Sequence, residues 1–145
     1  MANKRVPVQE GLFTWPSDQP CLIGSRDKAS GRVHFPAARN VGEDSEKVLL
    51  STRGKLYTWT IQNFLPKNPP YTGPETMETF QPYGVGYIEL PGEVIVESRL
   101  TTANPQELKI GMEMELTIIP FRHDENGDEI VTFAFKPVAL KGNQA

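Results

Sequence analysis

The spread of proline and glycine along the chain is the feature that most constrains its fold. The 145 residues include 13 prolines and 12 glycines, and both types recur through most of the sequence. Proline removes a backbone N–H group and glycine weakens a helix, so this spacing favours turns and short strands over long helices. A chain of this length can bury a core without disulfides or metals. We therefore predict a mostly β protein, either one domain or a domain with an appendage.

The distribution of prolines and glycines divides the chain into three zones. Prolines and glycines interrupt residues 1–47 throughout, which predicts an irregular N-terminal arm with at most a short helical turn at Val8–Phe13. Residues 48–139 alternate between strand-like runs and turn residues, which is typical of a β domain. Residues 140–145 form a short polar tail that we expect to be frayed.

Alternation of β-forming residues in the middle zone predicts five strands. They are expected at Val48–Asn63, Gly84–Leu90, Glu93–Leu100, Met112–Arg122 and Glu129–Lys136. Asn126-Gly127 is a strong hairpin signal between the last two. Between the third and fourth, Asn104 suits a helix N-cap and Pro105 the first helical position, so one or two helical turns fit there.

The order of these elements points to a known architecture. Three strands, a short helix and two further strands is the order of the five-stranded, partly open barrel called the OB-fold. We predict that fold, and a small β-sandwich is the structural alternative.

Charge and cysteine content exclude several classes of protein. The 15 basic and 18 acidic residues nearly cancel, which argues against a whole-chain electrostatic grip on nucleic acid. The single cysteine, Cys21, excludes an internal disulfide and a cysteine-rich zinc site. No apolar run approaches the roughly 18 residues that a membrane span needs, and no signal peptide follows the polar N-terminus. We expect a cytoplasmic protein that does not associate with membranes.

Candidate reactive groups are sparse, and each has a simpler interpretation. Cys21 and His34 would make a nucleophile and base only if the fold brought them into hydrogen-bond reach, and no third group is evident. Asp124–Glu129 is acidic, but a calcium loop needs about a dozen residues, so a solvated hairpin tip is favoured. Gly84-Val85-Gly86 lacks the third glycine of a dinucleotide-binding turn. We predict no catalytic residue and no cofactor.

Three aromatic residues give the main alternative function. Tyr57, Trp59 and Phe64 would stack nucleotide bases if the barrel bound single-stranded nucleic acid. The nearest basic residues, Lys55 and Lys67, do not form a cluster around them. A core or partner-facing role is therefore favoured.

The segment Phe64–Tyr83 is long for a connection between two strands. Its 20 residues carry five prolines together with several aromatic and other apolar side chains. Connections of this length are functional or disordered more often than not, and prolines lower the entropic cost of ordering a loop against a partner. We interpret it as a contact with a partner or a substrate channel, with packing on its own barrel as the alternative.

Several stretches resemble a known family. They are Leu22–Arg26, Gly31–Pro36, Leu50–Thr60, Pro82–Leu90, Leu108–Met112 and Thr132–Pro137. Their order and spacing are similar to those of the zinc-ribbon/OB-fold family of acyl-CoA-associated proteins. These proteins are small subunits that accompany thiolase-like enzymes, lipid-transfer-type aldolases and hot-dog-fold hydratases.

One departure from that family concerns its zinc ribbon. The first Cys-x-x-Cys pair of the family falls on Asp27 and Ser30 here, and the second pair is expected near Asn40–Gly42, where no cysteine occurs. Cys21 lies outside the ligand register. Tetrahedral zinc needs four thiolate or imidazole ligands, so we predict a degenerate ribbon without metal. Packing is expected to hold it through Val33, Phe35 and Trp15.

The resemblance implies a non-catalytic accessory subunit. Such a chain would assist a thiolase-like or lipid-transfer-type enzyme by shaping or closing its acyl-binding channel, with acyl-CoA at the subunit interface. A small independent enzyme and a single-stranded nucleic-acid-binding protein are the alternatives. The expected contact residues are Phe13, Trp15 and Phe35 of the arm and Phe64, Tyr71, Phe80 and Tyr83 of the long segment.

Overall fold

The computed structural model describes residues 4–38 and 44–138, and almost all the regular elements in this part of the chain are strands. The strands are β1 (Arg5–Pro7), β2 (Ile23–Asp27), β3 (Val33–His34), β4 (Ser45–Leu49), β5 (Arg53–Gln62), β6 (Tyr83–Glu89), β7 (Ile95–Leu100), β8 (Glu113–His123) and β9 (Glu129–Pro137). One helical turn, the 3-10 helix η1 (Pro105–Glu107), is also present. No helix in the described ranges has the length and apolar character needed to cross a membrane.

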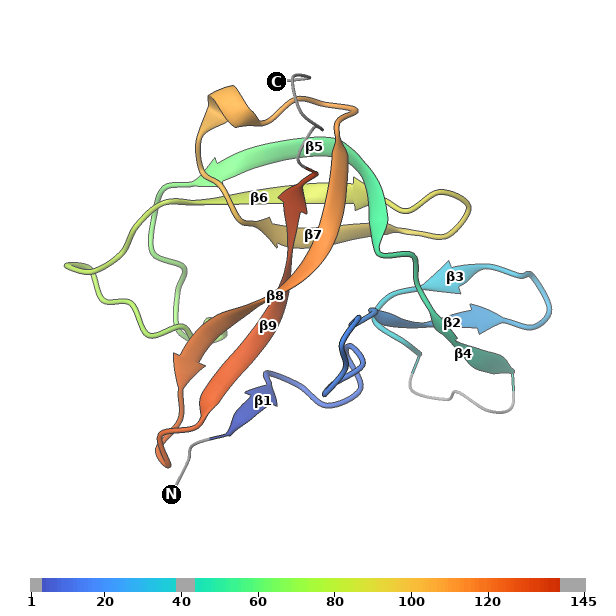
Figure 1. Ribbon diagram of the computed structural model, residues 1–145, viewed down its shortest axis with the longest axis horizontal. Coiled ribbons are helices and arrows are strands. Elements are labelled where there is room, and N and C mark those ends of the chain that lie inside the picture. The colour runs from blue at the N-terminus through green and yellow to red at the C-terminus, as the bar shows by residue number, and fades with distance from the viewer. Residues whose placement is uncertain (1–3, 39–43, 139–145) are drawn as a thin grey trace.

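Five strands close into a barrel. Their order is β5-β6-β7-β9-β8, and β8 pairs again with β5 at Arg53↔Glu115 to Lys55↔Glu113. The pairs are antiparallel except β7–β9, which meets in parallel at Leu100↔Phe135 (Figure 1). The predicted OB-fold is confirmed by this order and closure. Beyond the barrel, β8 and β9 continue as a long two-stranded ribbon that reaches toward β1.

A second, smaller sheet stands beside the barrel. It consists of β3, β2 and β4 in antiparallel order. Leu22, which directly precedes β2, and Leu50, which directly follows β4, are buried in the same apolar cluster as Leu56 of β5 and Leu90 at the end of β6. The two sheets therefore share one core. The predicted packing of Val33 is present, because this side chain lies in that cluster.

The predicted strand Val48–Asn63 is wrong as a single element. The chain leaves the small sheet after β4 and enters the barrel at β5, and Leu50 marks the crossing. The Leu50 side chain is buried in the core, and its backbone N–H donates to Leu22 O at 3.0 Å. Both halves carry β-forming residues, so alternation continues across the break. The proposed division between residues 1–47 and 48–139 stays a prediction; its boundary lies within β4, and β1 pairs with β9 across it.

The predicted helical turn at Val8–Phe13 is also wrong. The Val8 N–H donates to Val131 O at 2.7 Å, and Phe13 forms an isolated bridge with Leu22. Gly11 reverses the chain between them with a φ of 82°. Backbone bonds to β9 and β2 thus replace the bonds that a helix would make. The predicted tail at 140–145 lies outside the described residues.

The turn predictions hold. Asn104 caps η1 by accepting the Gln106 N–H at 3.0 Å, and Pro105 takes the first position. At the β8–β9 hairpin, Gly127 has a φ of 85°. The Asp124 carboxylate there accepts the N–H groups of Asn126 and Asp128, each at 2.9 Å. The acidic tip thus has a structural use for its first carboxylate.

Close packing of β5 on β6 makes Gly54 a sensitive position. A Cβ there would lie 2.5 Å from Glu89 O and 2.8 Å from a methyl carbon of Leu90. We expect Gly54→Ala to force the strands apart and to lower the free energy of unfolding by about 2 kcal/mol, as overpacking does. Urea unfolding measures this, with Lys55→Ala on the exposed side of β5 as the control. Equal midpoints for the two variants would contradict the prediction.

Candidate docking surface

The long loop of residues 63–82 joins β5 to β6 and is fastened to the barrel at its middle. Arg99 of β7 donates from Nη2 to the Tyr71 hydroxyl at 3.2 Å, and its guanidinium lies 3.8 Å from the centre of the Tyr83 ring. The Tyr71 hydroxyl donates to Glu75 Oε1 at 2.8 Å, and the Tyr71 ring stands edge-on to Phe121. Burial, followed by the bond to Glu75, raises the pKa of Tyr71, so the phenol keeps its proton. Arg99 is therefore the anchor of the loop.

The second part of the loop folds on itself. Thr76 and Thr79 exchange backbone and side-chain bonds in a tight turn. Phe80 then packs edge-on against Tyr83 with ring centres 6.1 Å apart. Three of the predicted contact residues, Tyr71, Phe80 and Tyr83, thus lie together on this side of the barrel and contact the chain itself.

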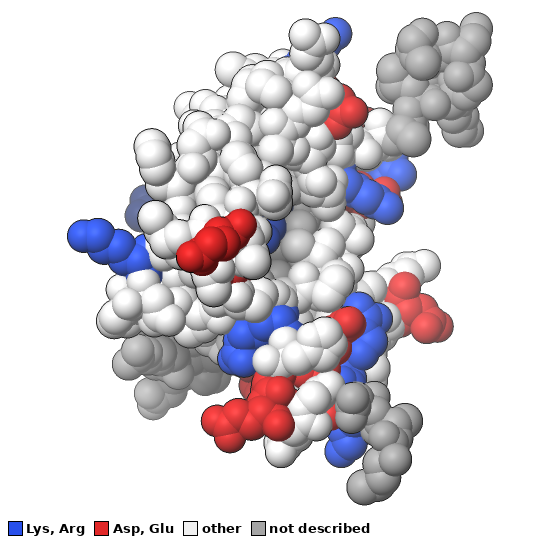
Figure 2. All heavy atoms as spheres, turned by 90° about the vertical axis from the view of Figure 1, so that its left-hand side faces the viewer, with Lys and Arg blue, Asp and Glu red and all other residues white. Residues whose placement is uncertain are grey.

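Two apolar side chains of the loop remain in solvent. Phe64 is 79% exposed and Met77 is 82% exposed. Figure 2 looks at the end of the molecule from which the loop projects, and the upper part of this view carries few charged side chains. We call the exposed side chains of Phe64 and Met77 the loop surface. Apolar surface of this kind is typical of a protein contact.

The arm places its three predicted contact residues differently. Phe13 is 3% exposed and belongs to the core, so its side chain is not available to a partner in this conformation. Trp15 is half-buried, with its ring edge-on to Phe13 and its Nε1–H donated to Arg5 O at 3.1 Å. Phe35 packs edge-on against Phe133 of β9 at 5.7 Å. The arm aromatics mainly attach the arm to the barrel.

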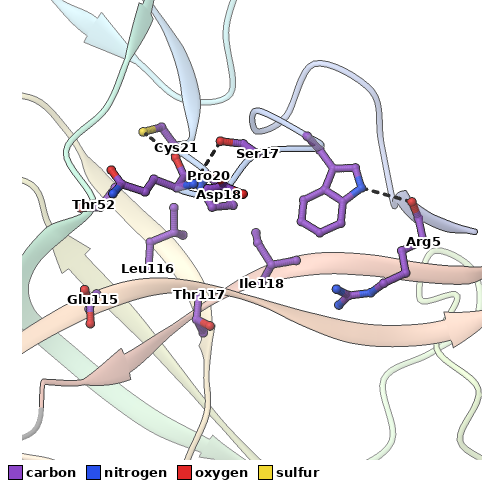
Figure 3. Close-up of a pocket in the computed structure, with 12 residues that line it drawn as sticks. Arg5, Ser17, Asp18, Pro20, Cys21, Thr52, Glu115, Leu116, Thr117 and Ile118 are labelled. Carbon is purple, nitrogen blue, oxygen red and sulfur yellow. Dashed lines mark hydrogen bonds between the residues drawn. The ribbon is translucent and has the colours of Figure 1, made fainter.

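A groove of about 610 Å³ separates the arm from β8. Figure 3 shows Leu116 and Ile118 of β8 pointing into it, with Pro20 and Asp18 of the arm on the opposite side. Trp15 also lines the groove, together with charged residues such as Arg5 and Glu115, so its exposed lining is more polar than apolar.

Cys21 and His34 do not form a reactive pair. Cys21 Sγ lies 3.7 Å from Gln19 O, and no hydrogen bond joins it to His34 within residues 4–38 and 44–138. His34 is exposed in β3, opposite Ser25 of β2. Across the same ranges, no three His, Cys, Asp or Glu side chains are grouped so that they could share a metal ion.

Asp27 closes the turn where the related ribbons are expected to carry a cysteine. Its Oδ1 accepts the N–H groups of Ala29 at 2.8 Å and Ser30 at 2.9 Å, and its carbonyl accepts the N–H of Gly31. These bonds, that of Ser30 first, lower the pKa of Asp27. A carboxylate used in this way and a serine do not suit tetrahedral zinc. The second predicted ligand region, near Asn40–Gly42, lies outside the described residues, so absence of metal stays a prediction.

The outer surface of the barrel does not support the alternative of single-stranded nucleic-acid binding. Trp59 packs partly against the core instead of offering its ring to solvent. Arg99 is engaged by the loop, and Arg53 pairs with Glu113 at 3.1 Å. Tyr57 is exposed, but a stacking site for single strands also needs a positive groove to follow the phosphates.

The closed barrel, with η1 between its third and fourth strands, defines an OB-fold protein. Residues 47–118 match the family described as the C-terminal OB-fold domain of ChsH2. The chain is 33% identical over 133 residues to the benzoylsuccinyl-CoA thiolase subunit BbsA of Thauera aromatica, covering 88% of this chain and 85% of that protein. It is 31% identical over 126 residues to a DUF35 domain-containing scaffold protein of Pyrococcus furiosus, covering 81% and 83%. The chain therefore belongs to the DUF35 family, as the resemblance implied.

A solved structure has the same fold. The chain matches the structure described as an Ltp2-ChsH2(DUF35) aldolase with a TM-score of 0.57 and 20% sequence identity. The match covers 82% of this chain and 86% of the other. At this identity the likeness concerns the fold.

Sequence reasoning missed Arg99. Its partners Tyr71 and Tyr83 lie 28 and 16 positions earlier in the chain, and no local pattern joins them. The available signal was indirect: a strand arginine beside a loop rich in aromatic rings.

Removal of the anchor is expected to loosen the loop. Arg99→Ala deletes the bond to Tyr71 and the contact with the Tyr83 ring, so amide hydrogen exchange of residues 63–82 should accelerate about tenfold or more. Arg53→Ala, which removes only the exposed ion pairs with Glu113 and Glu115, is the control. Unchanged exchange in the Arg99 variant would show that the loop is held by other contacts.

The turn at Asp27 gives a pH prediction. The folded-state pKa of Asp27 lies below its usual value, so its stabilising effect is complete above pH about 4 and is lost as the pH falls through the folded pKa. Asp27→Asn has no such titration. The difference in free energy of unfolding between wild type and variant should therefore be constant near neutral pH and shrink below pH 4 in chemical denaturation. A difference that grows on acidification would refute the assignment.

Proposed function

We propose that this chain is a non-catalytic accessory subunit of an acyl-CoA-processing enzyme of the thiolase superfamily or of the lipid-transfer-type aldolases. It docks onto the enzyme and shapes or closes the channel that holds the acyl group. Cys21 is the only cysteine, so the chain cannot form an internal disulfide. Because proteins without disulfides are typical of reducing compartments, we place the complex in the cytoplasm.

The loop surface is the observation that carries this proposal. Phe64 and Met77 stand largely in water on a loop whose middle is fixed by Arg99. Burial of each such side chain contributes roughly 1.5–3 kcal/mol, and a loop that is already anchored loses less entropy on binding. Exposed apolar side chains on a loop that is already ordered are a favourable arrangement for docking.

The chemistry of the described residues supports a partner that carries catalysis. Cys21 and His34 stay apart, and the Asp124 carboxylate is used within its own turn. Among the relatives, the Thauera protein is named as a thiolase subunit and the Pyrococcus protein as a scaffold. An accessory role for this chain agrees with both names.

The groove between the arm and β8 is the part of the chain that we assign to the acyl channel. Leu116, Ile118 and Trp15 give it an apolar strip within a lining that is otherwise mostly polar. A partner that covers it would complete a tunnel with acyl-CoA at the subunit interface. The apolar strip would then face the acyl chain, and the polar groups would face the rest of the acyl-CoA.

Co-expression with a thiolase-like enzyme tests the proposal, and a reading frame for such an enzyme next to this gene would supply the first candidate. We expect the two chains to co-purify, and Phe64→Ser combined with Met77→Ser to weaken the complex at least tenfold through lost apolar burial. Biolayer interferometry measures the affinity. Ile110→Ser is a matched control, because Ile110 is an exposed apolar residue outside the loop surface.

Two results would contradict the proposal. A wild-type chain that stays monomeric beside the enzyme would remove the accessory role. Turnover of an acyl-CoA by the purified chain alone would assign the chemistry to this subunit and not to its partner.

A further inference from the structure

A small hollow lies on the outward face of the barrel, between β5 and β6. Its volume is about 250 Å³, and Thr58, Tyr87 and Glu97 contribute to its walls. Tyr87 is directly opposite Thr58 on one side and Glu97 on the other, so the three residues form one row across the sheet. The space suits one side chain better than a nucleotide or a cofactor.

The row combines a ring and a carboxylate that have no internal partner. Tyr87 is 44% exposed, and Glu97 is exposed in the middle of β7. In the described part of the chain, neither side chain makes a hydrogen bond, and the recorded ion pairs are formed by other residues. Arg99, the next outward residue of β7, turns to Tyr71 and Tyr83 instead. The chain's own nearby cation therefore does not fill the hollow.

We propose that this hollow receives one arginine side chain of the enzyme partner. A guanidinium can lie over the Tyr87 ring and bond to the Glu97 carboxylate at the same time, a combination that favours a planar cation. The Arg99 guanidinium over the Tyr83 ring is an internal example of the same stacking on the same side of the barrel. Nucleic acid is disfavoured, because a carboxylate at the centre of the site repels phosphate.

The surroundings of the hollow have the composition of an interface. Tyr57, which stands at the bulge in β5, and Ile95 of β7 are both exposed on the outward face. Apolar residues around a buried arginine exclude water and strengthen its ion pair. Near the hollow, the outward acids Glu89 and Glu97 are matched in number by the bases Lys55 and Arg99. Arg99 is held by Tyr71 and Tyr83, so the Glu97 carboxylate in the wall of the hollow is the group that remains complementary to a cation.

This inference rests on the proposed function, because the arginine is assigned to the enzyme partner. It names a contact separate from the loop surface. The loop leaves β5 after Gln62 and enters β6 at Tyr83, whereas Tyr87 lies four residues further along β6. Loss of one contact therefore need not remove the other.

The test compares three forms of the chain against the co-expressed enzyme at several salt concentrations. We expect Glu97→Gln to weaken binding about tenfold or more and to flatten its salt dependence, because a charge-assisted pair is lost. Glu89→Gln, an exposed acid on the same side of β6 and outside the hollow, should stay within about twofold of wild type. Thermal unfolding verifies that both variants fold.

A second arm uses a small probe and does not need the enzyme. In an NMR titration, N-acetyl-arginine methylamide should shift the amide signals of Thr58, Tyr87 and Glu97 in wild type but not in the Glu97→Gln variant, and N-acetyl-norleucine methylamide should not shift them. If the enzyme binds wild type and the Glu97→Gln variant equally, the proposed arginine site in the hollow is overturned and the proposed function stands. If wild type does not bind enzyme, the proposed function fails, and the assignment of the arginine to that enzyme fails with it. In that case, shifts caused by the arginine probe would still support an arginine site in the hollow. Absence of those shifts would overturn the arginine site as well.

Discussion

A single apolar core shared by the barrel and the small sheet is the interaction on which the rest of the structure depends. Leu22 and Leu50 bring the small sheet into contact with barrel residues such as Leu90, and all three side chains are almost completely buried. Three short strands without such a core would be only marginally stable in water. Burial against the barrel therefore supports the small sheet independently of any metal, which is what the predicted metal-free ribbon requires. The turn at position 27 can then be closed by the Asp27 carboxylate.

The same core leaves the long loop free to serve another purpose. Residues 63–82 add little to the buried cluster, and their attachment depends on a few contacts around Arg99. Arg99, between the Tyr71 hydroxyl and the Tyr83 ring, orders the middle of the loop without burying Phe64 or Met77. Ordering is then partly complete before any partner arrives, so more of the energy of burying Phe64 and Met77 is available for binding. The fold thereby separates the core that stabilises the chain from the loop surface to which we assign recognition.

Most of the fold could be predicted from the sequence because strand alternation and turn residues act locally. The four strands from β6 to β9, the cap at Asn104 and the turn at Gly127 all carry such local signals. The break at Leu50 carried none, since a residue that crosses between two sheets has the same composition as a strand residue. Aromatic residues posed the same difficulty for the site. Phe13 and Phe64 look alike in sequence, but one is in the core and the other in solvent, and only long-range packing decides which.

The two outward surfaces differ in chemistry, and that difference suggests a division of roles. The loop surface is apolar and gains energy from burial, which is strong but has little directional preference. The hollow at Tyr87 and Glu97 offers a ring and a charge in fixed positions on a rigid sheet. An ion pair of this kind adds less to affinity than to orientation, because a wrongly aligned partner leaves the carboxylate desolvated and unpaired. The accessory subunit proposed above, which would align its groove with the channel of an enzyme, needs both properties. A docked pose set by burial alone would tolerate rotation, and rotation would misplace the wall formed by Leu116 and Ile118.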